Sequence, residues 1–223
     1  GSEMCIRDSN YLAFIPAYFY ENKKDVSKEE HLDFSKKFIE NNEHQEVTVV
    51  LDPTFLWEFN EITCKTKLGE KSIVLYSFDS IADYADEIID YANKHEYEIV
   101  SLAREYRWAN INLPAATEQE WITCFRNCEV VITDSYHGLV FALKNKKKVV
   151  LISREDKLNK NNGLLEFLGI QMSYYKKGSI DRYLHTETLD YSIINENIKK
   201  RKIESEKYLS AVSYTHLTLP TIR

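Results

Sequence analysis

The hydrophobic pattern of the chain alternates between short apolar runs and longer amphipathic stretches. Five short runs are rich in Val, Ile and Leu and are typical of strands buried on both faces of a sheet. They are Val47–Leu51, Ser72–Phe78, Glu98–Leu102, Glu129–Thr133 and Lys148–Ile152. In the stretches between them, apolar residues recur every three or four positions, which predicts helices with one buried face.

The helices predicted in this way cover Asp79–His95, the segment after Thr117, Gly138–Leu143 and Asp190–Leu209. Two of them begin with a capping signal. Ser80 followed by Asp83 resembles a capping box with aspartate in place of glutamate, and Thr117-x-x-Glu120 matches the motif itself. The segment Asn110–Ala116 has neither pattern, and we expect it to be an exposed loop.

Strands that alternate with helices in short units need crossover connections. The pattern therefore predicts an α/β fold with a mostly parallel sheet and helices on both faces. The chain has 223 residues, of which 43% are hydrophobic, enough for one sizeable core. In such sheets ligands bind outside the carboxyl ends of the strands, so polar residues directly after a strand are the first candidates for a site.

Composition and charge exclude several classes of function. Only 6 residues are glycine, and neither G-x-G-x-x-G nor G-x-x-x-x-G-K-[ST] occurs, which excludes a glycine-rich cradle for nucleotide phosphates. A net charge of −6 argues against nucleic acid as a partner. No apolar run approaches the ~18 residues of a membrane helix. We therefore expect a cytoplasmic protein, with peripheral attachment to the membrane as the alternative.

Two cysteines lie four residues apart on a predicted helix. Cys124 and Cys128 have no histidine near them in the sequence, whereas a structural zinc site needs further ligands at suitable spacing. We therefore expect both to be small core residues, and we expect no metal and no cofactor.

The two ends do not continue the patterns beside them. The first nine residues, GSEMCIRDS, and the last twelve, VSYTHLTLPTIR, resemble peptides translated from sequencing-adapter DNA. We therefore expect a non-native leader (1–9), one domain (10–211) and a non-native tail (212–223). On this interpretation the domain is a fragment of a longer protein.

The strongest candidate site is the segment Asp134–Gly138, between an apolar strand and a helix. Asp134 or Ser135 can cap that helix, whose first-turn N–H groups form an anion seat. His137 adds a hydrogen-bonding or cationic group, since histidine changes charge near neutral pH. Gly138 allows a ligand or a neighbouring backbone to approach closely. On spacing alone, a capped structural turn is the alternative.

A second candidate follows the first apolar run. Asp52 as N-cap with Pro53 at the first helical position is a clear helix start, and Thr54 comes next. Alone this motif is more often structural than functional. It becomes a candidate because we expect it to project from the same edge of the sheet as the turn at Asp134.

Taken together, these segments resemble the polysaccharide pyruvyl transferase family. The residues that carry the resemblance are VVLDPTFLW (Val49–Trp57), EWITCFRNCEVVITDSYHGLVFALKNKKKVV (Glu120–Val150), GLLEFLGI (Gly163–Ile170) and ENIKKRKIESEKYL (Glu196–Leu209). TDSYHG, between a valine-rich strand and an apolar helix, is the most specific of them. DPT followed by an apolar pair is the second.

The resemblance implies one Rossmann-like half of an enzyme with two domains, similar to the glycosyltransferase B architecture. It implies transfer of the enolpyruvyl group of phosphoenolpyruvate, a co-substrate, to a sugar or lipid-linked saccharide of a cell-surface polysaccharide, with a pyruvate ketal as product. Ser135, Tyr136 and His137 would contact phosphoenolpyruvate, with His137 as acid or electrostatic partner. Asp134 would order the turn, and Asp52 with Thr54 would shape the opposite wall.

The sequence departs from the family pattern in several places. Most of the amino-terminal domain and the Arg-Glu pair before the DPT strand are absent, and Lys160-Asn161-Asn162 stands where an arginine is usual. A lysine near Lys148 replaces the usual proline. The fragment is therefore expected to hold one wall of the active site, and its activity alone is left open. A nucleotide-sugar glycosyltransferase and a non-catalytic Rossmann-like module are the alternative functions.

Overall fold

The computed structural model describes residues 49–62, 71–78, 81–152 and 158–218. The chain divides into two compact units, one of residues 1–56 with 195–223 and the other of residues 57–194. The second unit contains the sheet. The predicted leader 1–9 lies outside the described residues, and the domain limits at residues 10 and 211 stay predictions.

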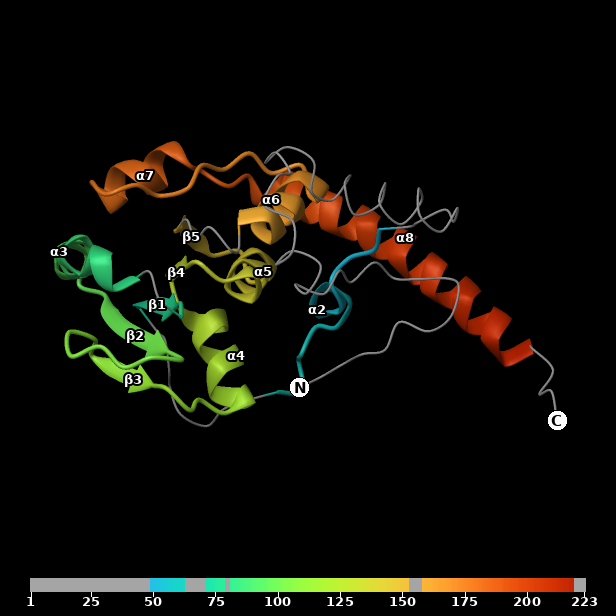
Figure 1. Cartoon of the computed structure of the whole chain (residues 1–223), viewed down its shortest axis with the longest axis horizontal. Helices are drawn as coiled ribbons and strands as arrows, with labels where there is room; N and C mark the ends of the chain where they lie inside the picture. The colour runs from blue at the N-terminus through green and yellow to red at the C-terminus, as the bar shows by residue number, and fades with distance from the viewer. Residues whose placement is uncertain (1–48, 63–70, 79–80, 153–157, 219–223) are drawn as a thin grey trace, which may run out of the picture. The chain divides into compact units, whose positions relative to one another are not determined.

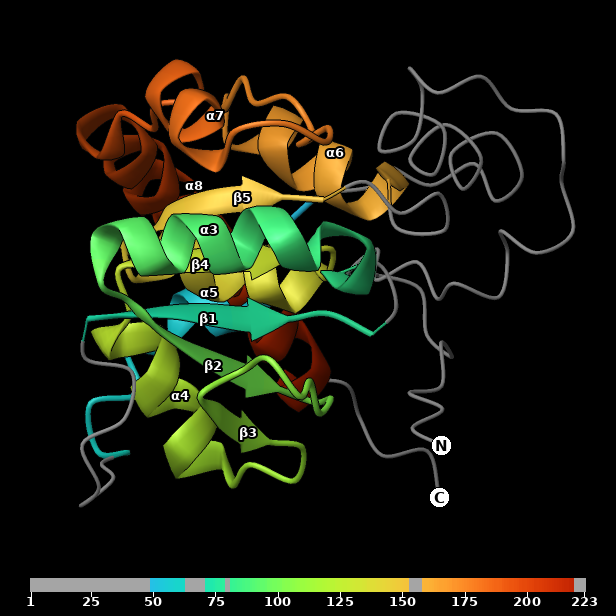
Figure 2. The same ribbon diagram turned by 90° about the vertical axis from the view of Figure 1, so that its left-hand side faces the viewer.

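A five-stranded parallel sheet forms the centre of the second unit. Its strands are β1 (Ser72–Tyr76), β2 (Glu98–Leu102), β3 (Ile111–Leu113), β4 (Val130–Thr133) and β5 (Lys148–Leu151). Their order across the sheet is β3-β2-β1-β4-β5, and every neighbouring pair is parallel (Figure 2). The predicted α/β, Rossmann-like fold is therefore confirmed.

Helices cover both faces of the sheet. On one side lies α3 (Ala85–His95), and on the other lie α4 (Glu118–Asn127) and α5 (Tyr136–Lys144) (Figure 1). Also present are α6 (Leu158–Phe167), α7 (Ile180–Thr186) and α8 (Tyr191–Thr218). Helices α3 and α7 pack on β-strand residues such as Leu75 and Ile132, which are fully buried.

The predicted helices are present, but some of them begin or end at other residues than predicted. Thr117 and Glu120 form the predicted capping box at the start of α4. The predicted cap Ser80 lies outside the described residues, and a 3-10 turn, Ile81–Tyr84, precedes α3. Helix α8 continues to Thr218, beyond the end predicted at Leu209, because the amphipathic pattern fades there while the backbone remains helical.

Two predictions of local structure were wrong. Asn110–Ala116 is not simply a loop, because Ile111–Leu113 forms β3 beside β2. The side chain of Asn110 accepts a hydrogen bond from the Ile99 N–H (2.7 Å) and so fixes the start of this pairing. Of the strand predicted at 47–51, residues 49–51 are described and belong to no strand. The N–H of Leu51 donates instead to the Ser205 hydroxyl (2.9 Å).

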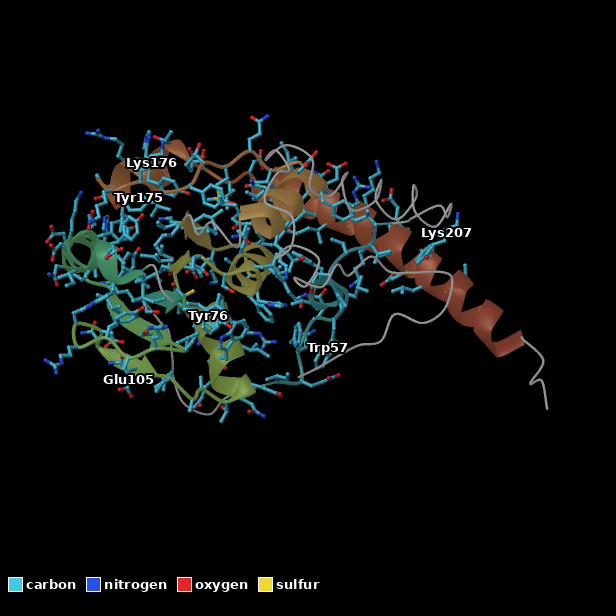
Figure 3. The ribbon with its side chains drawn as sticks, viewed as in Figure 1. Trp57, Tyr76, Glu105, Tyr175, Lys176 and Lys207 are labelled. Atoms are coloured by element: carbon cyan, nitrogen blue, oxygen red, sulfur yellow. The ribbon has the colours of Figure 1, made fainter. Side chains whose placement is uncertain are left out.

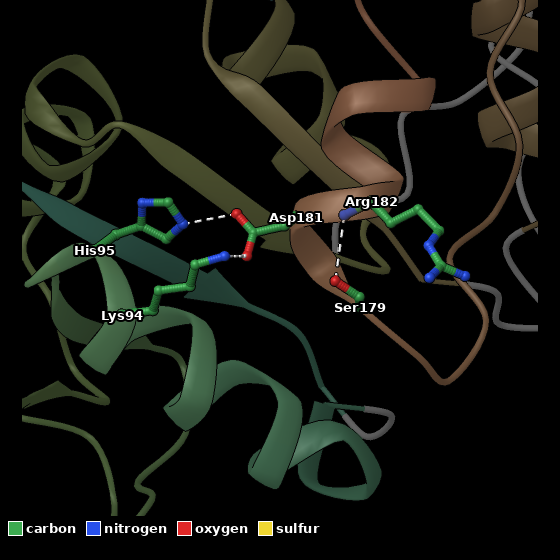
Figure 4. Close-up of polar contacts among 5 residues, drawn as sticks. All are labelled: Lys94, His95, Ser179, Asp181 and Arg182. Carbon is green, nitrogen blue, oxygen red and sulfur yellow. Dashed lines mark hydrogen bonds and ion pairs between the residues drawn. The ribbon is translucent and has the colours of Figure 1, made fainter.

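A pair of ionic contacts joins α3 to α7. The Asp181 carboxylate accepts from Lys94 Nζ (2.7 Å) and lies 2.7 Å from His95 Nε2 (Figure 4). The hydrogen bond from Lys94 is the main cause that lowers the pKa of Asp181 below its ordinary value. Both side chains of the Lys94 pair are more than a third exposed, so solvent screens the interaction.

We expect Asp181→Asn to lower the free energy of unfolding by up to about 1 kcal/mol at pH 7. A lowered carboxyl pKa stabilises the fold above the ordinary aspartate value of about 4, and this contribution disappears as pH falls through the lowered pKa. Denaturant unfolding should therefore give a larger difference at pH 7 than at pH 3. Glu105→Gln, at an exposed glutamate, is the control and should change neither value.

Candidate functional site

The strand order has one point, at the carboxyl edge of the sheet, where the direction of strand addition reverses. From β1 the chain moves outward through β2 to β3 and then returns to β4 on the other side of β1. The carboxyl ends of the paired strands β1 and β4 are therefore the topological switch point, where open α/β sheets bind ligands. Ser77 and Phe78 follow β1 here, and the Asp134–Gly138 turn follows β4.

Asp134 is fully buried at this point. Its Oδ2 accepts a hydrogen bond from Ser77 Oγ (2.8 Å), and its backbone carbonyl accepts one from Asn161 Nδ2 (3.4 Å). A carboxylate is tolerated in an apolar interior only when hydrogen bonds compensate its lost hydration. These bonds connect the end of β1, the end of β4 and α6 at one residue.

Thr133, one residue earlier, makes a second connection between the strands. Its Oγ1 donates to the Tyr76 carbonyl (2.6 Å) and accepts from the Ser135 N–H (3.0 Å). A Cβ added at Gly138 would lie 2.1 Å from this same oxygen and 3.1 Å from the Tyr76 ring. The sequence predicted that Gly138 would allow a close approach. The group that approaches is the side chain of Thr133.

The N-terminus of α5 carries no side-chain cap. Ser135 occupies the N-cap position, but its side chain accepts no hydrogen bond from the first turn. The prediction that Asp134 or Ser135 caps this helix was therefore wrong, since the Asp134 carboxylate is bonded to Ser77 instead. The first helical hydrogen bond runs from the Leu139 N–H to the Ser135 carbonyl (3.0 Å). The positive end of the helix dipole thus lies at the switch point without a side-chain acceptor from Ser135.

His137 and Tyr136 lie in the first turn of α5. His137 is exposed and Tyr136 is half-buried, with the two rings edge to face at a centroid separation of 5.4 Å. The imidazole is therefore accessible beside the helix N-terminus. The imidazole and the helix N-terminus together can attract an anion and offer it a proton or a hydrogen bond.

We expect Ser135→Ala to change the free energy of unfolding little, by less than about 0.5 kcal/mol. An N-cap serine ordinarily contributes about 1 kcal/mol through its side-chain hydrogen bond, which is not made here. Thr117→Ala, which breaks the capping box of α4, is the matched comparison and should lose about 1 kcal/mol. Urea unfolding of both variants measures the contrast, and equal losses would contradict it.

Asp52 and Thr54 belong to the first unit. Asp52 Oδ1 accepts from the Thr54 N–H (2.9 Å) at the start of the short helix α2 (Pro53–Leu56), so the predicted helix start is confirmed. The predicted shared sheet edge is not supported, because described residues 49–51 form no strand of the sheet. A role of Asp52 and Thr54 in the site stays a prediction.

Cys124 and Cys128 are buried, as predicted for core residues. Burial raises the pKa of the Cys128 thiol to about 12.

Among the residues that the structure describes, no three His, Cys, Asp or Glu side chains are placed to hold a metal ion. No helix in this part of the chain has the length and apolarity to cross a membrane.

Ser77 and Asn161 were missed as site residues. Ser77 directly follows the SIVLY strand, so the rule that selected Asp134 also applies to it. Asn161 has no such signal in sequence, because its contact with Asp134 comes from the packing of α6 beside the turn. Both side chains are buried, so they stabilise the turn and offer no exposed polar group.

Comparison with known proteins gives one family match. The model of the family described as "Polysaccharide pyruvyl transferase" matches residues 33–156, a range that contains the Asp134–Gly138 turn. A solved structure described as "Crystal Structure Analysis of the Glycotransferase of kitacinnamycin" is 13% identical, with a TM-score of 0.47, over 80% of this chain and 50% of that chain. The present chain thus spans about half the length of that structure. No curated protein matches the chain.

Proposed function

The chain belongs to the polysaccharide pyruvyl transferase family, and on that premise we propose which reaction it serves. It transfers the pyruvyl group of phosphoenolpyruvate to a sugar of a cell-surface polysaccharide or its precursor. The product is a pyruvate ketal, and phosphate is released. Phosphoenolpyruvate is a co-substrate, and the proposal needs no resident cofactor.

One observation carries this proposal: the N-terminus of α5, without a side-chain cap, lies at the switch point beside the exposed His137. Phosphoenolpyruvate bears a phosphate and a carboxylate on a small frame. Backbone N–H groups at a helix N-terminus favour such anions, and an imidazole can add a charge-assisted hydrogen bond. This arrangement accommodates a phosphate without a glycine-rich loop, in agreement with the low glycine content.

The proposed reaction balances without an oxidant or reductant. Two hydroxyl groups of one sugar residue form two C–O bonds to carbon 2 of phosphoenolpyruvate, and the bond from that carbon to the phosphate oxygen breaks. One hydroxyl proton is matched by the proton that the methylene carbon gains as it becomes a methyl group. The proton of the second hydroxyl group leaves with inorganic phosphate. Protonation of the methylene carbon calls for a general acid, the role proposed for His137.

The other residues have supporting roles in this proposal. Ser135 and Tyr136 contact phosphoenolpyruvate from the first turn of α5, and Asp134 orders that turn through its hydrogen bond with Ser77. Gly138 keeps the turn close to β1.

The test is incubation of the chain with phosphoenolpyruvate and a saccharide that carries a free vicinal or 4,6-diol. We expect phosphate release that depends on the saccharide, together with a new ketal methyl signal in the proton NMR spectrum. Calorimetric titration should give binding of phosphoenolpyruvate but not of UDP-glucose. Binding of UDP-glucose alone would overturn the proposal in favour of a glycosyltransferase. Binding of neither ligand, without turnover, would favour a non-catalytic module.

A further inference from the structure

One large apolar side chain is exposed at the switch point. Phe78 is 42% exposed, whereas its neighbour Ser77 is 2% exposed. Phe78 comes two residues after the end of β1, next to the residue that is hydrogen-bonded to Asp134. Its position at the edge where such sheets bind ligands makes this ring a candidate contact for one.

The ring of Phe78 rests on a packed aromatic support. It meets Tyr76 edge to face, with centroids 5.5 Å apart and an angle of 70°. Tyr76, labelled in Figure 3, is in turn held by Trp121 at 5.3 Å and Phe125 at 6.0 Å. Phe125 is fully buried. Phe78 therefore packs against the ring of Tyr76 while 42% of its surface stays exposed at the end of β1.

The same support reaches the proposed phosphoenolpyruvate site. The Tyr76 ring is one of the nearest neighbours of Gly138, which directly follows His137 in α5. In the register of the sheet Tyr76 pairs with Thr133. Ser77 and Asp134 therefore come next on their two strands, and their hydrogen bond fixes the backbone beside Phe78. A ligand on Phe78 would thus be adjacent to the first turn of α5.

We propose that Phe78, supported by Tyr76, binds the acceptor saccharide by stacking against the apolar face of one sugar ring. The inference deepens the proposed function and rests on it, because the acceptor supplies the occupant. A pyranose has one face made mainly of C–H groups, whose positive hydrogens match the negative face of an aromatic ring. Two neighbouring rings are far too small for a stable protein interface, which needs about 1,200–2,000 Å², whereas they suit a single sugar.

The experiment is saturation-transfer NMR with the full chain and three probes, the methyl glycosides of β-glucose, β-galactose and α-mannose, without phosphoenolpyruvate. We expect saturation of the aromatic protons to transfer to the C–H protons on one face of at least one sugar. Phe78→Tyr keeps the aromatic face and should keep the transfer. Phe78→Leu keeps an apolar side chain against Tyr76 but has no aromatic face. It should weaken binding by about 2- to 12-fold, the range that one aromatic pair contributes.

Trp57→Ala is the matched control, since Trp57 is 49% exposed and its ring contacts Phe59 rather than Tyr76. It should leave the transfer unchanged. No transfer from any probe, or equal transfer with Phe78→Leu, would overturn the inference. The proposed function fails separately: if the chain releases no phosphate from phosphoenolpyruvate but binds saccharide through Phe78, the stacking site stands alone. If Phe78→Leu turns over with an unchanged KM for saccharide, the reaction stands and the stacking site is wrong.

Discussion

Replacing His137 with alanine is expected to slow phosphate release from phosphoenolpyruvate by about 10²- to 10⁴-fold, the usual contribution of a general acid. His137 is exposed in the first turn of α5, so its removal opens no cavity in the core. The loss should therefore appear in kcat rather than in the stability of the fold. Steady-state phosphate release at saturating phosphoenolpyruvate and saccharide, with thermal unfolding in parallel, makes the measurement.

His137→Gln separates binding from proton transfer. Glutamine keeps a hydrogen-bond donor for the phosphate but cannot act as an acid near neutral pH. We expect it to bind phosphoenolpyruvate in calorimetry with an affinity closer to that of the original chain, while its kcat stays as low as that of His137→Ala. His185→Ala, at another exposed histidine, is the control and should leave both quantities unchanged. An unchanged kcat in His137→Ala would remove histidine from the proposed chemistry.

The parts of the fold that were predictable from sequence are those with local signals. The cores of β1, β2, β4 and β5 coincide with runs of Val, Ile and Leu, because strands buried on both faces tolerate few other residues. The capping box of α4 is likewise complete within four residues. Strand β3 has no such signal. Its three residues are half-buried or exposed, and its position depends on the contact of Asn110 with Ile99 across a turn.

The candidate site divides in the same way. The turn itself was predictable, because the positions after a strand and before a helix are consecutive in sequence. Its supports were not, since Ser77 and Asn161 are separated from Asp134 by 57 and 27 residues. For the apolar run at 47–51 a local signal was present, but the strand that it predicted is not formed at the described residues 49–51. Its β-branched composition is local, but in the described part the Leu51 N–H meets the side chain of Ser205 rather than a neighbouring strand.

Gly138→Ala is expected to destabilise the fold by about 3 kcal/mol. Inside a helix, alanine is ordinarily better than glycine by about 1 kcal/mol, so propensity alone predicts the opposite sign. Here the new Cβ would lie 2.1 Å from Thr133 Oγ1 and 2.9 Å from Thr133 Cβ. To relieve these contacts α5 has to move away from β4, an overpacking cost of about 1–3 kcal/mol. Thr133 also has to rotate and lose its bonds to Tyr76 and Ser135, a further cost of about 1–3 kcal/mol. Urea unfolding measures the sum.

A double-mutant cycle with Thr133→Ala identifies the cause. Thr133→Ala alone should lose about 1–3 kcal/mol, because the Tyr76 carbonyl and the Ser135 N–H lose their partner. In the double variant the closest clash is gone, so the loss should be smaller than the sum of the two single losses by at least about 1 kcal/mol. A gain of stability in Gly138→Ala, or strict additivity in the cycle, would mean that α5 does not press against Thr133. The first turn that carries His137 would then lack this link to β1.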